Sequence, residues 1–109
     1  MKGVTMAASE RDITADITAT TATETIEKLE QLKGVSSIDM FFIDSEVGGE
    51  DGLSAIDVLA WLKENKSSLP KTIQFVAGDF ESRIKLELFA MDELGYKWDG
   101  LVWKLGGQQ

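Results

Sequence analysis

Cysteine and histidine are absent from this chain of 109 residues, and proline occurs once, at Pro70. The lack of cysteine excludes disulfides, thiol nucleophiles and zinc–thiolate sites. The lack of histidine removes the most common general base and the most common metal ligand. Any catalysis would therefore use carboxylates, hydroxyls or lysines. Any metal would be a hard cation, such as Mg²⁺ or Ca²⁺, bound by oxygen atoms.

Long apolar runs and basic residues are also scarce. No apolar run approaches the ~20 residues of a membrane span, and the first residues lack the pattern of a signal peptide. We therefore expect a cytoplasmic protein without a membrane partner. The 19 acidic residues outnumber the 11 basic ones, and the net charge is −8. This charge argues against direct binding of nucleic acid. It either keeps the protein soluble or forms a surface for a basic protein partner, including by imitation of nucleic acid.

The spacing of apolar residues predicts one α/β domain over residues 1–109, with strands and helices in alternation. Such alternation implies right-handed crossovers and a mostly parallel sheet. In chain order, the expected elements are a weak strand or arm at 4–8, a strand at 13–19, a helix from Thr21 to Gly34, a strand at 38–43, a helix at 53–65, a strand at 73–77, a helix from Asp79 to Gly95, and a C-terminal β-hairpin around Asp99-Gly100.

Two packing expectations concern the last third of the chain. The final helix carries an apolar stripe at helical spacing, which we expect to face the core; its members are Phe80, Ile84, Leu88 and Met91. In the hairpin, a two-residue turn at Asp99-Gly100 would pair Trp98 with Leu101 and Tyr96 with Trp103.

Acidic residues follow two of the buried strands. Ligands bind at the carboxyl ends of strands in open α/β sheets. If the two strands are neighbours, Asp44, Glu46 and Asp79 would converge there and could bind a divalent cation. Asp79 also has a complete explanation as the N-cap of the next helix.

One stretch resembles a known family. The sequence FFIDSEVGGEDGLSAIDVLAWLKEN is similar to the middle of a receiver domain, and most similar to the cyclic-phosphate-processing receiver family. The resemblance implies a three-layer receiver-like (flavodoxin-like) fold and places Asp44 where receivers accept a phosphoryl group. The chain departs from the pattern, since Ser45 and Ala77 stand where the family has histidine and a hydroxyl residue. Lys97 and Lys104 are the candidates for the receiver lysine.

The departures favour a non-catalytic function. We expect an acidic protein-interaction module, such as an inhibitor of a basic or nucleic-acid-binding protein, with no cofactor. The predicted partner-binding residues are Glu50, Asp51, Tyr96, Trp98 and Trp103. Small acidic chains of this composition are typical of inhibitors, antitoxin-like proteins and phage-encoded proteins. The alternative is a Mg²⁺-dependent phosphoryl-accepting switch or cyclic-phosphate-processing enzyme with Asp44 as the catalytic residue. A third possibility is self-association through the hairpin edge.

Overall fold

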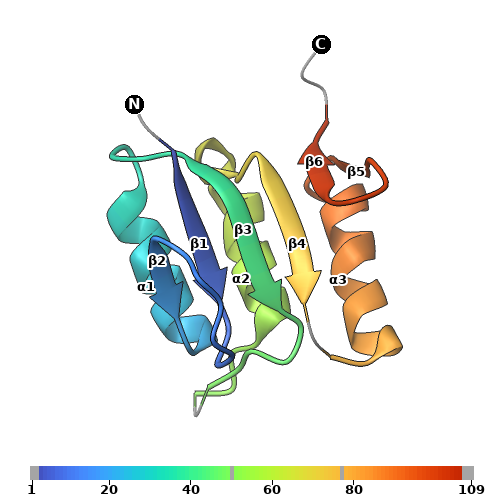
Figure 1. Ribbon diagram of the computed structural model, residues 1–109, viewed down its shortest axis with the longest axis horizontal. Helices are drawn as coiled ribbons and strands as arrows, with labels where there is room; N and C mark the ends of the chain where they lie inside the picture. The colour runs from blue at the N-terminus through green and yellow to red at the C-terminus, as the bar shows by residue number, and fades with distance from the viewer. Residues whose placement is uncertain (1–2, 50, 77, 107–109) are drawn as a thin grey trace.

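The computed structural model of the protein describes residues 3–49, 51–76 and 78–106 (Figure 1). This part of the chain forms a six-stranded sheet with helices packed on it. None of its helices is long and apolar enough to cross a membrane. In chain order, the elements are β1 (Val4–Ala8), β2 (Ile17–Ala19), α1 (Ala22–Leu32), β3 (Ile38–Asp44), α2 (Ala55–Glu64), the short 3₁₀ helix η1 (Lys66–Ser68), β4 (Thr72–Val76), α3 (Phe80–Asp92), β5 (Tyr96–Trp98) and β6 (Trp103–Leu105).

The strands lie in the order β2-β1-β3-β4-β6-β5. The sequence predicts a mostly parallel sheet with a C-terminal hairpin, whereas the observed sheet is mixed. β1 pairs in parallel with both β2 and β3, and β3 pairs in parallel with β4. β6 joins β4 in the antiparallel direction, and β5 pairs antiparallel with β6. The hairpin thus extends the parallel strands instead of packing separately.

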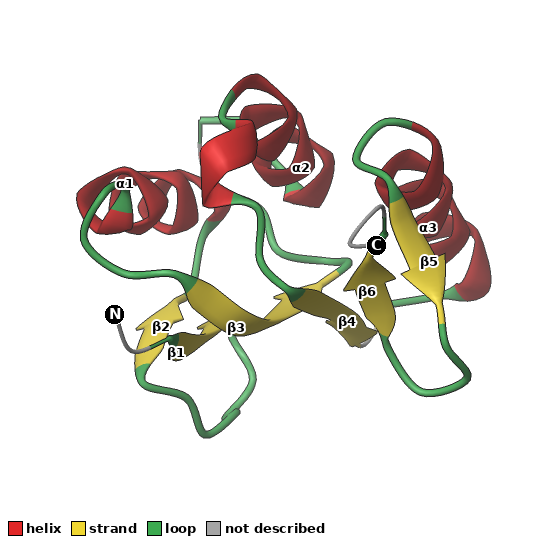
Figure 2. Ribbon diagram, turned by 90° about the horizontal axis from the view of Figure 1, so that it is seen from above, coloured by secondary structure: helices red, strands yellow, loops and turns green. Residues whose placement is uncertain are grey.

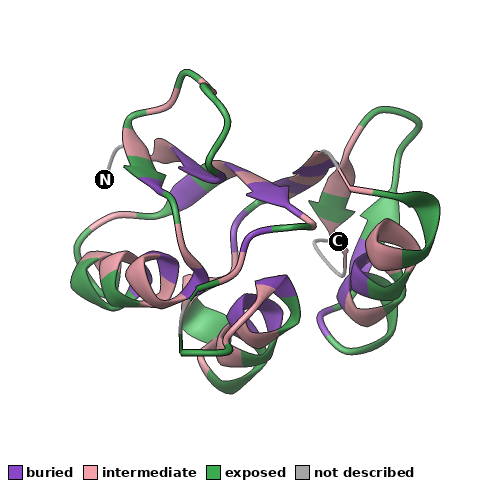
Figure 3. Ribbon diagram, turned by 90° about the horizontal axis from the view of Figure 1, so that it is seen from below, coloured by how far each residue is buried: buried purple, intermediate pink, exposed green. Residues whose placement is uncertain are grey.

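All three α-helices lie on one side of the sheet (Figures 2 and 3), so the molecule has two layers, and the expected three-layer arrangement is wrong. The handedness of the crossovers explains the difference. The connections from β2 to β3 and from β3 to β4 cross the sheet in one direction, and right-handed crossovers in one direction place their helices on one face. Among the connections between parallel strands, that from β1 to β2 runs the other way, and residues 9–16, which form it, contain no helix.

Local signals explain where α1 begins and ends. The Thr21 hydroxyl accepts a hydrogen bond from the Glu24 N–H at 3.0 Å, and the Glu24 carboxylate accepts one from the Thr20 N–H at 2.8 Å. This reciprocal capping satisfies backbone donors that have no partner inside the helix. After the helix, Gly34 adopts a φ of 76°, which glycine reaches without a steric cost. Both ends agree with the sequence prediction.

The core lies between the sheet and the helices. Phe41 of β3, Met6 of β1 and Ile73 of β4 are fully buried and belong to one cluster with Leu59 and Leu62 of α2. In the view from below, buried segments follow the central strands and the inner sides of the helices (Figure 3). The apolar run at 38–43 is therefore a central strand, as predicted.

The apolar stripe of α3 faces solvent. Phe80, Leu88 and Met91 are 69%, 48% and 44% exposed, and the helix enters the core through Leu86 and Ala90 instead. Ile84, the fourth member of the stripe, is half-buried. The expectation that the stripe packs on the core is therefore wrong for Phe80, Leu88 and Met91. Because α3 is apolar on two faces, residue spacing alone does not decide which face meets the sheet.

The C-terminal hairpin is present, but its register differs from the prediction. Trp98 pairs with Trp103, and Tyr96 pairs with Leu105. The connecting loop therefore spans residues 99–102, and the expected two-residue turn is wrong. The Asp99 carboxylate accepts hydrogen bonds from the Leu101 N–H at 2.8 Å and the Val102 N–H at 2.9 Å. These bonds stabilise the longer loop.

The loop predicts an unusual titration of Asp99. Hydrogen bonds from the N–H groups of Val102 and Leu101 lower the pKa of Asp99 to about 2, and the Lys104 ammonium at 3.2 Å contributes less. This pKa lies below the ordinary value of about 4. Ionised Asp99 therefore stabilises the hairpin fully above about pH 4, and the stabilisation is lost as the pH falls from about 4 toward 2. An NMR titration of the Asp99 carboxyl carbon should have its midpoint near pH 2, with little change in Lys104→Gln. An ordinary midpoint would contradict the loop geometry.

Candidate functional site

Two strands end side by side where the chain reverses its direction across the sheet. β1 and β3 are parallel neighbours, with Ala8 opposite Ile43, and the connections that follow them leave in opposite directions. In open α/β sheets, ligands bind outside the strand ends at such a point. Here Ser9 follows β1 and Asp44 ends β3. Asp44 therefore lies at the strand ends, as the sequence predicts.

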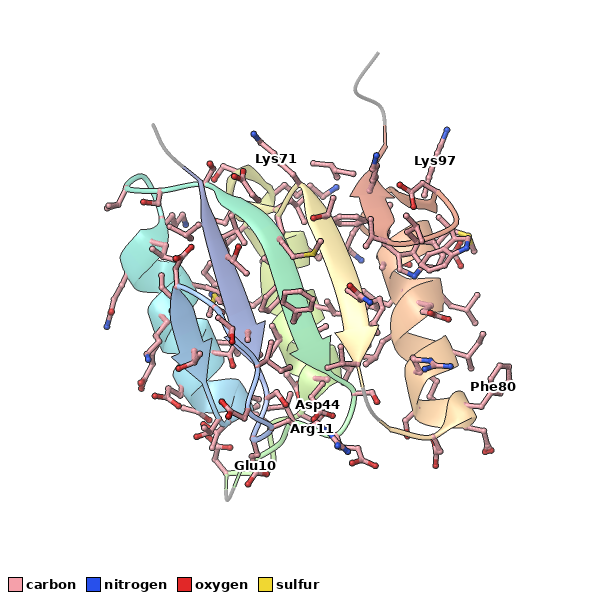
Figure 4. The ribbon with its side chains drawn as sticks, in the orientation of Figure 1. Glu10, Arg11, Asp44, Lys71, Phe80 and Lys97 are labelled. Carbon is pink, nitrogen blue, oxygen red and sulfur yellow. The ribbon has the colours of Figure 1, made fainter. Side chains whose placement is uncertain are left out.

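The Asp44 carboxylate is buried, and both of its oxygens have partners. Asp44 is 5% exposed. The Ser9 hydroxyl donates to Oδ2 at 3.0 Å, and the Arg11 Nε lies 3.4 Å from the same oxygen. The Glu46 N–H donates to Oδ1 at 2.8 Å. Figure 4 shows Asp44 and Arg11 together at this edge. The carboxylate is thus paired and hydrogen-bonded, which is the usual condition for a charge in the interior of a protein.

The lysines suggested by the receiver resemblance lie at the other end of the sheet. Lys104 is opposite Thr72, the first residue of β4, and Lys97 is opposite Lys104. Figure 4 shows Lys97 and Asp44 at opposite ends of the molecule. Neither lysine is therefore placed to contact a group bound at Asp44. The phosphoryl-accepting role of Asp44 therefore stays a prediction, which rests on the resemblance of the sequence to receiver domains.

The three candidate metal ligands are only partly brought together. Glu46 contacts Asp44 through its backbone N–H. Asp79 is instead the N-cap of α3, where its carboxylate accepts a hydrogen bond from the Ser82 N–H at 2.8 Å. This hydrogen bond lowers the pKa of Asp79. Within residues 3–49, 51–76 and 78–106, no group of three or more acidic side chains is arranged to hold a metal ion. A Mg²⁺ site at these residues stays a prediction.

An open, acidic depression of about 570 Å³ lies beside the strand ends. Glu10, Glu46 and Asp51 line it together with threonines at the start of α1. The Thr23 hydroxyl donates a hydrogen bond to the Asp51 carboxylate and lowers the pKa of Asp51. This depression is therefore negatively charged at neutral pH and suits a basic side chain. Glu50, which we also expect to bind a partner, lies outside the described residues.

A second candidate surface consists of exposed apolar side chains on α3 and the hairpin loop. We name it the α3–hairpin surface, and its residues are Phe80, Leu88, Met91, Trp98 and Leu101. Trp98 and Leu101 are 54% and 78% exposed, and Phe80 points away from the sheet (Figure 4). Phe80 is the first residue of α3 and lies at the end of the helix away from the hairpin (Figure 4). Single exposed apolar residues are ordinary, but five large ones on one helix and the hairpin that follows it make this side of the molecule a candidate for partner binding.

The three aromatic residues predicted to bind a partner differ in their environment. Tyr96 is 1% exposed, and its hydroxyl donates a hydrogen bond to the Pro70 carbonyl. Burial raises the pKa of Tyr96, and the prediction that it contacts a partner is wrong because it belongs to the core. Trp98 and Trp103 pack together, with ring centroids 5.5 Å apart and planes at 52°. The Trp103 indole N–H donates to Glu87 at 3.4 Å.

Sequence reasoning missed several residues of the α3–hairpin surface. The spacing of apolar residues predicts Phe80, Leu88 and Met91 in the core and Leu101 in a strand opposite Trp98. A signal was present, because Leu86 and Ala90 form a second apolar face on the same helix. Only one of two such faces can pack on the sheet. The other face must contact either a further element of the same chain or an external partner, or remain exposed.

Comparisons with known proteins assign no family, because no protein-family model, curated protein or solved structure matches this chain.

Proposed function

We propose that this chain is a non-catalytic protein-interaction module of the cytoplasm, which binds a basic protein partner through the α3–hairpin surface. The observation that carries the proposal is the exposure of the apolar stripe of α3. Burying large side chains of this kind against a partner stabilises the complex by roughly 25 cal/mol for each Å² of apolar surface removed from water. Interfaces concentrate their binding energy in such aromatic and apolar anchors.

The order of the parallel strands, though not the number of layers, supports a receiver-like scaffold for this module. The parallel strands follow the order β2-β1-β3-β4, which is the order of the first four strands of flavodoxin-like sheets. On such a scaffold, Asp44 would be the reactive residue. Its contacts with Ser9, Arg11 and Glu46 occupy both carboxylate oxygens and support a structural role. The scaffold would then serve binding instead of phosphoryl chemistry.

The acidic depression and the net charge of −8 support a basic partner. Acidic surfaces accelerate the encounter with a basic protein, and this effect weakens as salt screens the charges. An inhibitor that covers the basic surface of a nucleic-acid-binding protein would have this combination of an acidic exterior and an apolar anchor.

The test compares three proteins as affinity baits in a lysate of the organism that encodes the chain. They are the wild type, the double variant Leu88→Ser/Met91→Ser, and the matched control Val35→Ser. Val35 is 61% exposed but follows α1, away from the α3–hairpin surface. We expect a basic protein to be retained by the wild type and the control. Its affinity for the double variant should fall about tenfold or more, since anchor side chains contribute about 1–2 kcal/mol or more each.

Circular dichroism must show that the three proteins have the same folded content. The purified partner is then titrated against each of them by calorimetry at two salt concentrations. Equal affinity for the wild type and the double variant would refute the proposed surface. A partner whose binding does not weaken with salt would refute the role of the acidic charge.

A further inference from the structure

The hairpin covers only part of the neighbouring edge of β4. β6 pairs with Thr72 and Ile73, whereas, among the described residues, Gln74, Phe75 and Val76 have β3 as their only strand neighbour. Backbone groups alternate between the two sides of a strand. The Lys71 carbonyl accepts a hydrogen bond from Leu105, and Ile73 pairs with Trp103. Phe75 is therefore the next residue whose N–H and C=O point toward the hairpin side, beyond the end of β6.

A cavity of about 310 Å³ lies at this uncovered edge. It is bounded by β4, α3 and the hairpin, and its lining residues are Gln74, Phe75, Arg83, Glu87, Trp98, Leu101 and Trp103. Trp98 and Leu101 belong to the α3–hairpin surface, so the cavity opens beside it. Its apolar walls have room for a large side chain, and its polar groups come from β4 and α3.

The charged side chains of the cavity are not paired with each other. Arg83 and Glu87 are four residues apart on α3, yet the ion pairs of the described residues include neither of them. Glu87 accepts the Trp103 indole N–H through Oε2. At the cavity itself Arg83 offsets the charge of Glu87, so the attraction for a positively charged segment comes from the net charge of −8.

We propose that the partner binds here as an extended segment that adds a strand to β4 at Gln74–Val76 and places a large apolar side chain in the cavity. This inference rests on the proposed function and names the form of the partner. In strand addition, backbone hydrogen bonds provide affinity and side-chain pockets provide specificity. Lysine or arginine residues next to the apolar side chain would match the acidic chain. The site would leave Asp44 uninvolved, because Asp44 lies at the other edge of β4.

The experiment uses the full chain, labelled with ¹⁵N, and the probe peptide acetyl-Lys-Thr-Val-Phe-Val-Thr-Lys-amide. We expect saturable shifts of the Gln74, Phe75 and Val76 amides and of the Trp98 and Trp103 indoles. Hydrogen exchange of the Phe75 amide should slow at saturation. The same peptide with N-methyl groups on its three central residues keeps the side chains but loses backbone donors. It should bind roughly two- to tenfold more weakly, because it loses the hydrogen bond to the Phe75 C=O, and one such bond contributes roughly 0.5–1.5 kcal/mol.

Matched variants test the walls of the cavity. Trp98→Ala should weaken binding of the peptide about tenfold, whereas Val35→Ser should leave it unchanged. Replacing both lysines of the peptide with glutamate should weaken binding at low salt.

Three results would overturn the strand addition. The first is that the N-methylated and unmodified peptides bind with equal affinity. The second is that the amide shifts are confined to Phe80, Leu88 and Met91. The third is that no amide shifts at millimolar peptide. The second result would leave the proposed function intact, because the α3–hairpin surface would then bind without β4. Loss of the proposed function is detected separately, by equal binding of the partner to Leu88→Ser/Met91→Ser.

Discussion

Replacement of Phe41 by alanine should lower the free energy of unfolding by about 3–5 kcal/mol, the range for removing a phenylalanine from a well-packed core. Phe41 is fully buried in the middle of β3, where it is opposite Met6 of β1 and Ile73 of β4. All three belong to the cluster beneath the helices. The substitution removes apolar surface and leaves a cavity that the surrounding sheet cannot close. For a domain with a total stability of roughly 5–15 kcal/mol, such a loss is severe.

The next residue along the strand provides the control. Successive side chains of a strand point to opposite faces, so Phe42 lies on the face without helices, and it is only half-buried. We expect Phe42→Ala to cost roughly half as much or less, because much of the side chain already contacts water. Urea unfolding followed by circular dichroism measures both variants. Equal losses would show that the second face of the sheet is covered as well as the first.

Asp44→Ala should lower the free energy of unfolding by about 2–3 kcal/mol. The carboxylate accepts hydrogen bonds from the Ser9 hydroxyl and the Glu46 N–H, and Ser9 is itself buried. Removing the carboxylate leaves the Ser9 O–H without an acceptor, although the Ser9 oxygen still accepts the Arg11 N–H, and a buried donor left in this way costs roughly 1–3 kcal/mol. It also removes the attachment of the β1–β2 connection to the end of β3.

Arg11→Gln separates the hydrogen bonds of Asp44 from its ion pair. The Arg11 side chain is 61% exposed, and exposed ion pairs contribute about 0–1 kcal/mol. We therefore expect a small change in this variant and a large one in Asp44→Ala, both measured by the same urea titration. If Asp44→Ala were as stable as the wild type, Asp44 would have no structural role. The phosphoryl-accepting alternative would then regain support.

Local sequence signals predicted most of the elements. Thr21 with Glu24 marks the start of α1 because both capping bonds form within four residues, and Gly34 ends the same helix through its own backbone. The run at 38–43 predicted a central strand, and β3 is one, but only its helix-facing side chains are fully buried, because the other face of the sheet carries no helix. Asp44 could be placed at a strand end because it follows this run. These features depend on neighbours in the chain, so no knowledge of the whole fold was needed.

The remaining features depend on residues far apart in the chain. Ser9 and Asp44 are 35 positions apart, so no local pattern reveals that the carboxylate has a partner. The orientation of α3 depends on whether Leu86 or Leu88 finds space on the sheet. The hairpin register depends on Asp99, whose side chain accepts bonds from the loop and favours four residues over two. The number of layers depends on the direction of each crossover, which the strand order alone determines.

The position of β1 also has a consequence for the order of folding. The first strand of the chain lies between two strands that come later, and Met6 is opposite both Ile17 and Phe41. During synthesis, Val4–Ala8 must therefore wait until β3 has left the ribosome before its second edge is covered. Proteins rich in such distant pairings have a high contact order, and they fold slowly because the entropy of closing the long loop is lost before the contacts form. The hairpin, by contrast, joins neighbours in the chain and can form at once.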